Sequence, residues 1–339
     1  MRYVQSFIVA SLLACVIYYV FILILIDAPV PAEYWVAEMI TIKKELVKNY
    51  AGKNKIIIAG GSSTLFGIDA EYASRLLDMP VINFGLHAGL RLEKILQEVS
   101  TVVERGDLLI LPLEPPYYYN TELNSWHVTN IIGWDHAAWK EMSYPEKFEF
   151  VSLVSPTLFG QMFISEVLKK IYPARISDRL RSLDKSLILA KFHARTLPSV
   201  FGYSAYNLNS HGDMQRTEGS KFKGQGFNIC KLNHICDKTV NNLMDFVDSM
   251  EKKGVRVYFS NTPYIASGVD KNEVRKSELS FQKEFSSIGC FIDKREDLVF
   301  DRKYFFNTSL HLNAEGRAIR TDLLINAIRK NVLSGTYNH

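Results

Sequence analysis

A strand that ends in two glycines and two serines constrains this chain more than any other segment. Residues 55–59 (Lys-Ile-Ile-Ile-Ala) have the apolar pattern of a buried strand, and Gly60, Gly61, Ser62 and Ser63 follow directly. Glycines permit a tight turn from strand to helix. A serine in that turn presents its hydroxyl at the carboxyl edge of a sheet, where open α/β folds place their chemistry. The alternative is an ordinary turn whose serines cap the next helix.

Strand and helix patterns then alternate along the chain. Strands are predicted at 55–59, 81–84, 107–111, 255–260 and 289–292, and helices at 69–77, 90–104, 271–285 and 313–330. This alternation favours a parallel sheet with helices on both faces. We therefore expect a three-layer α/β/α fold with five parallel strands. An aromatic, loop-rich stretch at about 115–238 breaks the alternation and predicts a large insertion, with helical patches near 159–171 and 178–190.

The N-terminal segment is predicted to cross a membrane. Residues 6–26 carry no charge and are almost wholly apolar, and a helix of this length spans a hydrocarbon core of ~30 Å. Arg2 precedes this run and Asp27 and Glu33 follow it, so the positive-inside rule puts the N-terminus in the cytoplasm. A cleaved signal peptide is the alternative, but its apolar region is usually only ~7–15 residues long.

We therefore expect a signal anchor over residues 1–28, which contacts the membrane through residues 7–26. A stalk would follow over 29–52 and an α/β domain over 53–335. A single pass through the cytoplasmic (inner) membrane would anchor the domain outside the cytoplasm. In an envelope with two membranes, this compartment is the periplasm.

Composition excludes some classes of function. The 40 Lys and Arg residues nearly balance the 36 Asp and Glu residues, so the net charge of +4 does not favour nucleic acid. Cys230 and Cys236 are close enough in sequence to form a disulfide in an oxidising compartment. Zinc with His234 is the alternative, but the spacing matches no zinc pattern. We expect no metal and no cofactor.

A late histidine complements the early serine. His311 stands just before the last predicted helix, and Asn307 and Thr308 precede it. A serine and a histidine that meet in the fold are two parts of a nucleophilic hydrolase or transferase site. A lone histidine at this position would more often be a surface or capping residue.

Two further strand ends carry candidate site residues. Gly85, His87, Ala88 and Gly89 follow the second strand, and their backbone amides are candidates for a second oxyanion donor. Glu114 follows the third strand at a rigid turn before two prolines. The alternatives are ordinary glycines after a strand and a solvated loop glutamate.

The order of these motifs resembles the SGNH (GDSL-type) hydrolase superfamily, whose sheet is flavodoxin-like. More closely, the chain resembles its membrane-anchored members that O-acylate cell-surface polysaccharides, such as the alginate acetylation and lipoteichoic-acid D-alanylation proteins. The resemblance covers about residues 55–116 and 255–330. The motifs are short, and their order is the better indication.

The resemblance implies a role for each matching residue. Gly61-Ser62-Ser63 matches the family's Gly-Asp-Ser, which makes Ser63 the nucleophile, and His311 takes the position of the base. The amide of Ser63 and an amide at Gly85, Ala88 or Gly89 would bind the oxyanion.

Two positions depart from the family pattern. Glu114 lies near the family's asparagine donor, and an ionised carboxylate cannot donate a hydrogen bond. Thr308 replaces the family's aspartate, and Asn307 precedes it. The site would thus be a Ser–His dyad, or a triad whose acid is Glu114 or Asp301.

The aromatic insertion supplies candidate substrate-binding residues. Tyr117, Trp126 and Trp134 are expected to stack on sugar rings, with His87 nearby, although aromatic residues of a packed subdomain would give the same pattern. We expect an extracytoplasmic serine O-acyl, most simply O-acetyl, transferase or esterase that acts on a polysaccharide. Its partner would be a polytopic membrane acyltransferase. The alternative is an inactive SGNH-fold scaffold or glycan-binding subunit of a polysaccharide modification or export complex.

Overall fold

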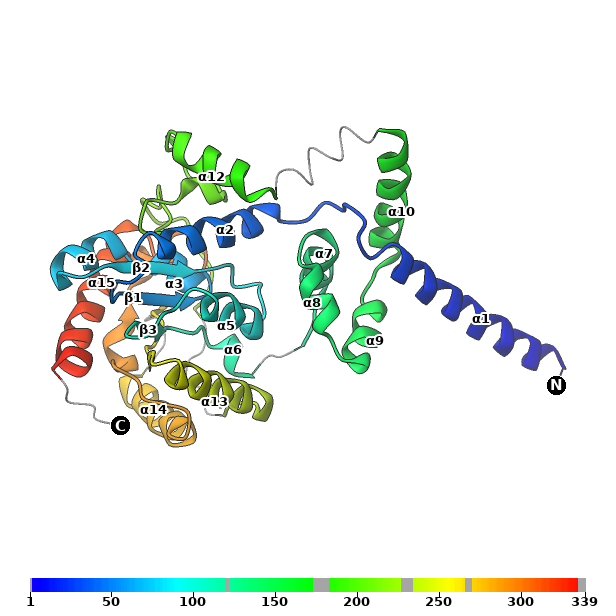
Figure 1. Ribbon diagram of the computed structural model, residues 1–339. Helices are drawn as coiled ribbons and strands as arrows, with labels where there is room; N and C mark the ends of the chain where they lie inside the picture. The colour runs from blue at the N-terminus through cyan, green and yellow to red at the C-terminus, as the bar shows by residue number, and fades with distance from the viewer. Residues whose placement is uncertain (1, 120–121, 173–182, 227–233, 266–269, 335–339) are drawn as a thin grey trace. The chain divides into compact units, whose positions relative to one another are not determined.

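The protein contains a parallel sheet whose strands run in the order β2-β1-β3-β4 (Figure 1). The computed structural model describes residues 2–119, 122–172, 183–226, 234–265 and 270–334. The strands are β1 (Ile56–Gly60), β2 (Val81–Gly85), β3 (Leu108–Leu111) and β4 (Arg256–Phe259). All but the first residue of β4 are buried, as is typical of a parallel sheet covered on both faces. The predicted α/β class with a parallel sheet is confirmed.

The fifth predicted strand, at 289–292, is only a single parallel bridge between Phe259 and Phe291. The amide of Phe259 donates to Cys290 O at 3.0 Å, and the amide of Ile292 donates to Phe259 O at 2.9 Å. Directly afterwards, the Asp293 carboxylate accepts the amide of Asn261 at 2.8 Å. This side-chain bond takes the place of a further ladder bond, so the regular sheet has four strands instead of five.

The chain divides into two compact units. Unit 1 comprises residues 1–38 and 122–190, and unit 2 comprises residues 39–121 and 191–339. Within unit 2 the helices are the later part of α2 (Tyr34–Lys48), α3 (Ser62–Gly67), α4 (Ala70–Leu77), α5 (Leu92–Ser100), α6 (Pro116–Tyr119), the end of α12 (Lys185–Ala194), α13 (Asp237–Lys252), α14 (Lys271–Phe285) and α15 (Ala314–Ile328), which continues into η5 (Arg329–Leu333). A two-stranded parallel sheet joins β5 (Tyr264–Ile265) to β6 (Val299–Phe300).

The core of unit 2 follows the alternation of side chains along the strands. Ile56 and Ile58 of β1 share a buried cluster with Ala73 of α4 and with Leu324 and Ile328 of α15. The intervening strand residues face the other way, and α5 and α13 contact β1 and β4. Of these helices, α4, α5 and α15 lie within ranges predicted as helical, whereas α13 was not predicted.

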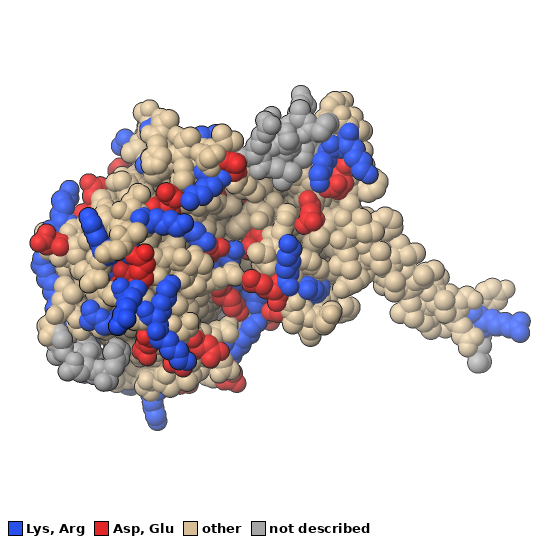
Figure 2. Space-filling model, in the orientation of Figure 1, with Lys and Arg blue, Asp and Glu red and all other residues tan. Residues whose placement is uncertain are grey.

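Unit 1 is helical. Its helices are α1 (Arg2–Ile24), the start of α2, α7 (Ser125–Gly133), α8 (His136–Glu141), α9 (Tyr144–Ser152), α10 (Pro156–Ile171) and the start of α12. The C-terminal end of α1, through Ile22, shares a buried cluster with Val128, Phe150 and Met162. The earlier part of α1 is exposed and, apart from Arg2, carries no charge (Figure 2). It is the one helix of the described residues that by itself is long and apolar enough to span a membrane.

Two predicted boundaries differ from the structure. Residues 39–48, expected as part of a stalk, form the buried second half of α2 in unit 2, because Met39, Ile42 and Leu46 lie on one helical face and are covered. The stretch at 115–238, expected as one insertion, is divided between the units at residues 122 and 190. The helical patch at 159–171 lies within α10, whereas the patch at 178–190 and Cys230 fall partly or wholly outside the described residues.

Candidate active site

The glycine–serine turn lies where the sheet reverses its winding direction. From β1 the chain first adds β2 on one side and then β3 on the other. Crevices outside the carboxyl ends of strands at such a switch point are where open α/β sheets bind ligands. Gly60 ends β1, Gly61 is the N-cap of α3, and Ser62 and Ser63 begin that helix. The predicted strand–turn–helix is therefore confirmed at the position that favours chemistry.

Two glycines that lie against α3, Gly61 at its N-terminus and Gly85 at the end of β2, are closely packed. A Cβ atom on Gly61 would lie 2.5 Å from Glu114 Oε1 and 2.6 Å from the Tyr117 hydroxyl. A Cβ atom on Gly85, at the end of β2, would lie 2.2 Å from the backbone nitrogen of Leu65. These separations are too short for any side chain, so Gly61 and Gly85 let α3 sit directly against β2 and the Glu114 carboxyl.

The Glu114 carboxyl holds the glycine–serine turn through two hydrogen bonds. Its Oε1 accepts the amide of Ser63 at 2.7 Å and its Oε2 accepts the amide of Gly61 at 3.0 Å. The side chain is buried, and burial raises the pKa of Glu114 to about 7 despite these two hydrogen bonds. The Ser63 amide, predicted as an oxyanion donor, therefore already has a protein acceptor.

The Ser63 hydroxyl has no hydrogen-bond partner among the described residues, although the residue is only 3% exposed. The Thr64 hydroxyl next to it donates to Pro112 O at 3.3 Å. Ser63 is thus a buried serine whose hydroxyl is not used to hold the fold. A hydroxyl without a structural partner is the condition that a nucleophile needs.

His311 is held as a neutral imidazole. Its Nδ1 lies 2.8 Å from Asn307 Oδ1, and because an amide oxygen only accepts, Nδ1 carries the proton. The lone pair is therefore on Nε2, the tautomer that a general base needs. Burial, with a smaller contribution from the charge of His87, lowers the pKa of His311 to about 3.

Asn307, and not Glu114 or Asp301, contacts the His311 ring among the described residues. The Asn307 amide nitrogen in turn donates to the Tyr203 hydroxyl at 2.8 Å. Thr308, at the position of the family's aspartate, accepts the amide of His311 at 3.1 Å through its hydroxyl. Thr308 therefore shapes the backbone turn, while Asn307 orients the ring.

Phe66 packs against His311 and lies on the same helix as Ser63. The rings of Phe66 and His311 are stacked, with centroids 4.0 Å apart and planes parallel within 1°. Ser63 precedes Phe66 by three residues on α3, so the two side chains lie on one face, a helical turn apart. No hydrogen bond joins the Ser63 hydroxyl to His311 in the part of the chain that the structure describes.

The loop after β2 contributes contacts of its own. The amide of Gly89 donates to His87 Nδ1 at 3.0 Å, and the amide of Gly85 donates to Asn83 Oδ1 at 2.9 Å. Ala88 O accepts the Tyr117 hydroxyl at 3.4 Å, and Tyr117 is buried. The amides of Gly85 and Gly89 thus serve the loop itself.

The two candidate tryptophans belong to unit 1. Trp126 Nε1 donates to Glu33 Oε1 at 3.3 Å, and Trp134 Nε1 donates to Asn130 Oδ1 at 2.8 Å. Both indole N–H groups therefore have partners within their own unit. These contacts fit the packing interpretation of the aromatic insertion better than a free stacking platform.

A buried polar network supports α3, and the sequence reasoning missed most of it. Lys43 of α2 donates to Asn83 O at 2.7 Å and to Gly212 O at 2.9 Å. Asn83 donates to Thr64 O and to Asp213 Oδ1, each at 3.1 Å. Burial lowers the pKa of Lys43 to about 7, against the opposing charge of Asp213. A lysine inside the apolar stripe of α2 was the signal that could have identified this network.

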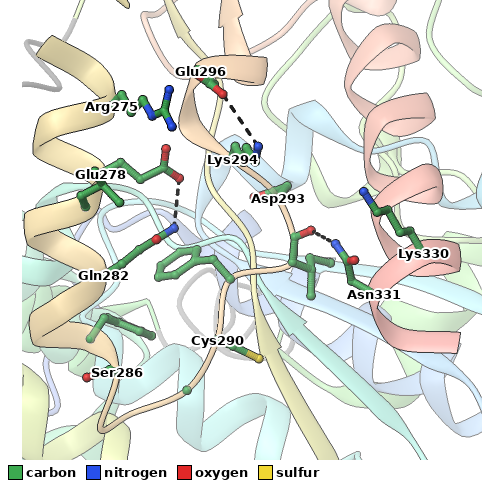
Figure 3. Close-up of a pocket in the computed structure, with 15 residues that line it drawn as sticks. Arg275, Glu278, Gln282, Ser286, Cys290, Asp293, Lys294, Glu296, Lys330 and Asn331 are labelled. Carbon is green, nitrogen blue, oxygen red and sulfur yellow. Dashed lines mark hydrogen bonds and ion pairs between the residues drawn. The ribbon is translucent and has the colours of Figure 1, made fainter. Parts of the chain in front are cut away.

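A separate pocket of about 690 Å³ opens between α14, the segment after it and η5 (Figure 3). Charged and amide side chains dominate its rim, among them Glu278, Gln282, Asp293 and Lys330. Neither Ser63 nor His311 lines it. Within the described residues, no group of His, Cys, Asp and Glu side chains could hold a metal ion.

Comparison with known proteins adds no further assignment. No protein-family model, curated protein or solved structure matches this chain.

Proposed function

We propose that this protein is a membrane-anchored serine O-acyl, most simply O-acetyl, transferase or esterase that acts on an extracytoplasmic polysaccharide. The observation that carries the proposal is the His311 imidazole. Asn307 accepts the Nδ1 proton of His311, so the Nε2 lone pair of His311 is available. The His311 ring stacks on Phe66, and Ser63 lies one helical turn from Phe66 on α3.

The chemistry would proceed through an acyl-serine. His311 Nε2 takes the Ser63 proton as the serine oxygen attacks the acyl carbonyl. The tetrahedral intermediate collapses, and the leaving group departs with that proton. A sugar hydroxyl or water then gives its proton to Nε2 and attacks the acyl-serine, and the proton returns to the Ser63 oxygen. Both acceptors use the same intermediate.

Glu114 would take part in binding the oxyanion. Its carboxyl accepts the Ser63 amide, and an ionised carboxylate at this place would repel a developing negative charge. A pKa of about 7 leaves about half of the Glu114 carboxyls neutral near pH 7, and a neutral carboxyl can donate its own proton. A carboxylic acid kept neutral by an apolar site is a known oxyanion donor in enzymes. We infer that active enzyme carries a protonated Glu114.

The resemblance to the SGNH superfamily supports the same proposal. Under it, the Phe259–Phe291 bridge is the remnant of a fifth parallel strand in a three-layer fold. Helix α1 would anchor the protein in the cytoplasmic membrane with unit 2 outside the cytoplasm, and a polytopic membrane acyltransferase would supply the acyl group.

A second function, that of a non-catalytic scaffold or glycan-binding subunit, is favoured by two observations. The Ser63 amide is occupied by Glu114, and no carboxylate contacts His311 among the described residues. Loss of the orienting carboxylate lowers turnover about 10⁴-fold in the best-studied serine triad. A protein that kept the fold without the chemistry would have these features.

The deciding experiment is incubation of the full-length protein with an activated acetyl ester, followed by mass spectrometry of its peptides. We expect acetylation of the Ser63 peptide, its loss in Ser63→Ala and a large decrease in His311→Gln. Ser62→Ala is the matched control, because Ser62 is an equally buried neighbour, and it should keep most of the activity. Normal acetylation in both Ser63→Ala and His311→Gln would exclude the enzyme and leave the scaffold.

A further inference from the structure

Helices α9 and α10 of unit 1 form a bent pair that no catalytic argument explains. They meet at an angle of 95° across a break of three residues, and together they are long and apolar enough to match a broken membrane span. The first ten residues of α10, Pro156 to Ser165, contain no charged side chain. A soluble helix of this composition would normally be covered.

The exposed face of α10 is an apolar stripe. Phe163, Ile164, Val167, Leu168 and Ile171 are each between 40% and 59% exposed. Their spacing of i, i+1, i+4, i+5 and i+8 places them on one side of the helix. Contiguous exposed apolar surface of this kind marks a site for a protein or a membrane.

Contacts with α1 place this bent pair at the depth of the proposed membrane span. The Tyr18 hydroxyl donates to Val154 O, in the bend, at 2.9 Å. The rings of Tyr18 and Phe159 lie with centroids 5.0 Å apart. Tyr18 is six residues before the end of α1, about 9 Å along the helix axis at ~1.5 Å per residue. The bend therefore lies beside α1 near the end of the proposed span, close to the boundary of the layer that α1 would cross.

The backbone at the bend can tolerate an apolar environment. The amide of Leu153 donates to Glu149 O and to Phe150 O, and the amide of Val154 donates to Val151 O. Ser155 caps α10 by accepting the amide of Leu158 at 3.1 Å. Non-helical backbone at membrane depth requires this kind of internal satisfaction.

We expect the pair to lie along the membrane surface instead of crossing it, because both helices carry charged residues. Glu146, Lys147 and Glu149 lie within α9, and Lys169 and Lys170 lie in the last turn of α10. Lysines at such ends extend their amines to the headgroups while their stems stay in apolar surroundings. Figure 1 shows α10 directed across the C-terminal end of α1 and not alongside it.

We propose that α9 and α10 form an interfacial membrane element, with the α10 stripe inserted at the boundary between headgroups and acyl chains where α1 ends. The occupant of the stripe is lipid, because the stripe is continuous, through Tyr18 and Phe159, with the surface of α1. The inference rests on the proposed anchoring by α1 and is independent of the chemistry at Ser63. It gives the protein a second attachment to the same leaflet.

The test uses the full-length chain in lipid nanodiscs, with its four cysteines replaced by serine and one nitroxide label per variant. The test positions are Ile164→Cys and Val167→Cys on the stripe. Leu13→Cys on α1 reports the anchor, and Leu279→Cys is the matched control, since it is an exposed leucine on helix α14 of unit 2. Power saturation compares collisions with oxygen, which concentrates in lipid, with those of a water-soluble nickel chelate.

We expect the labels at 164, 167 and 13 to collide more with oxygen than with nickel, and the label at 279 to do the reverse. Nickel access at 164 and 167 with a lipid signal at 13 would overturn the interfacial element while leaving the anchor intact. Poor access to both reagents at 164 and 167 would mean that protein covers the stripe, and this result overturns the proposal too. A water-accessible label at 13 would overturn the anchor and the inference together.

A second measurement covers the case in which the cysteine-free chain does not fold. Benzoylphenylalanine replaces Ile164 in the otherwise unchanged chain, and light then attaches it to its neighbours. Lipid adducts support the proposal. Adducts to protein alone, or no adduct, overturn it.

Discussion

Replacing Glu114 by glutamine should change how the stability of unit 2 depends on pH. Glu114 is buried, and its pKa is raised from 4.5 to about 7. A raised pKa means that the folded state holds the proton more tightly than the unfolded state. The contribution of this group to stability is therefore full below pH 4.5 and is lost as the pH rises through 7.

The magnitude follows from the two pKa values. Between pH 5 and pH 9, the wild-type protein should lose about 2.5 kcal/mol through this group, at about 1.4 kcal/mol for each unit of pKa difference. Glu114→Gln removes the titration but keeps the shape. His311 titrates at lower pH in both proteins, so its effect cancels from the difference between them.

The assay must report on unit 2. All four tryptophans, Trp35, Trp126, Trp134 and Trp139, lie in unit 1, so their fluorescence would report the wrong unit. Cys290 is half-buried in unit 2. Pulse labelling of its thiol at increasing urea, read from the mass of its peptide, follows the unfolding of that unit.

We expect the unfolding free energy of the wild type, relative to Glu114→Gln, to fall by about 2.5 kcal/mol from pH 5 to pH 9. The variant itself is expected to be less stable at pH 5, because the NH2 group that replaces one carboxyl oxygen of Glu114 cannot accept the backbone N–H of Gly61 or Ser63 bonded at that place. A difference that stays constant within about 0.5 kcal/mol over this range would refute the raised pKa and, with it, the protonated donor.

Two further outcomes test neighbouring contacts. Asn307→Ala should reduce acetylation of Ser63 and leave thermal unfolding nearly unchanged, because Asn307 holds Nδ1 of His311 at the surface of the site. Asn307→Asp should restore the activity and raise the pKa of His311, which the pH profile of the rate would record, and equal rates in all three proteins would remove Asn307 from the mechanism. Gly61→Ala should destabilise unit 2 by about 1–3 kcal/mol, because its Cβ would overlap Glu114 and Tyr117. Gly202→Ala, where a Cβ meets no atom within 4 Å, is the control, and equal thermal unfolding of the two variants would contradict the packing argument.

Much of the fold was predictable because local patterns and tertiary structure agree. The apolar run before Gly60 is too short for a helix and fits a buried strand. The apolar spacing in 90–104 fits a helix that packs one face against a sheet. Most of the charge-free run at 6–26 forms one helix, which ends at Ile24. The prediction of a fifth full strand failed because Asp293 forms a side-chain bond with Asn261 that no local pattern records.

The sequence by itself determined the chemical types at the strand ends, namely the serine after β1, the glutamate after β3 and the late histidine. Only the tertiary structure decided what each of them contacts. Glu114 binds two amides of the serine turn, Asn307 holds His311, and Lys43 is buried beside Asn83. The reason is physical. A residue's type fixes which bonds it can make, but its partners here lie 51 residues away for Ser63 and Glu114 and 40 for Lys43 and Asn83, and only the packed chain brings them within reach.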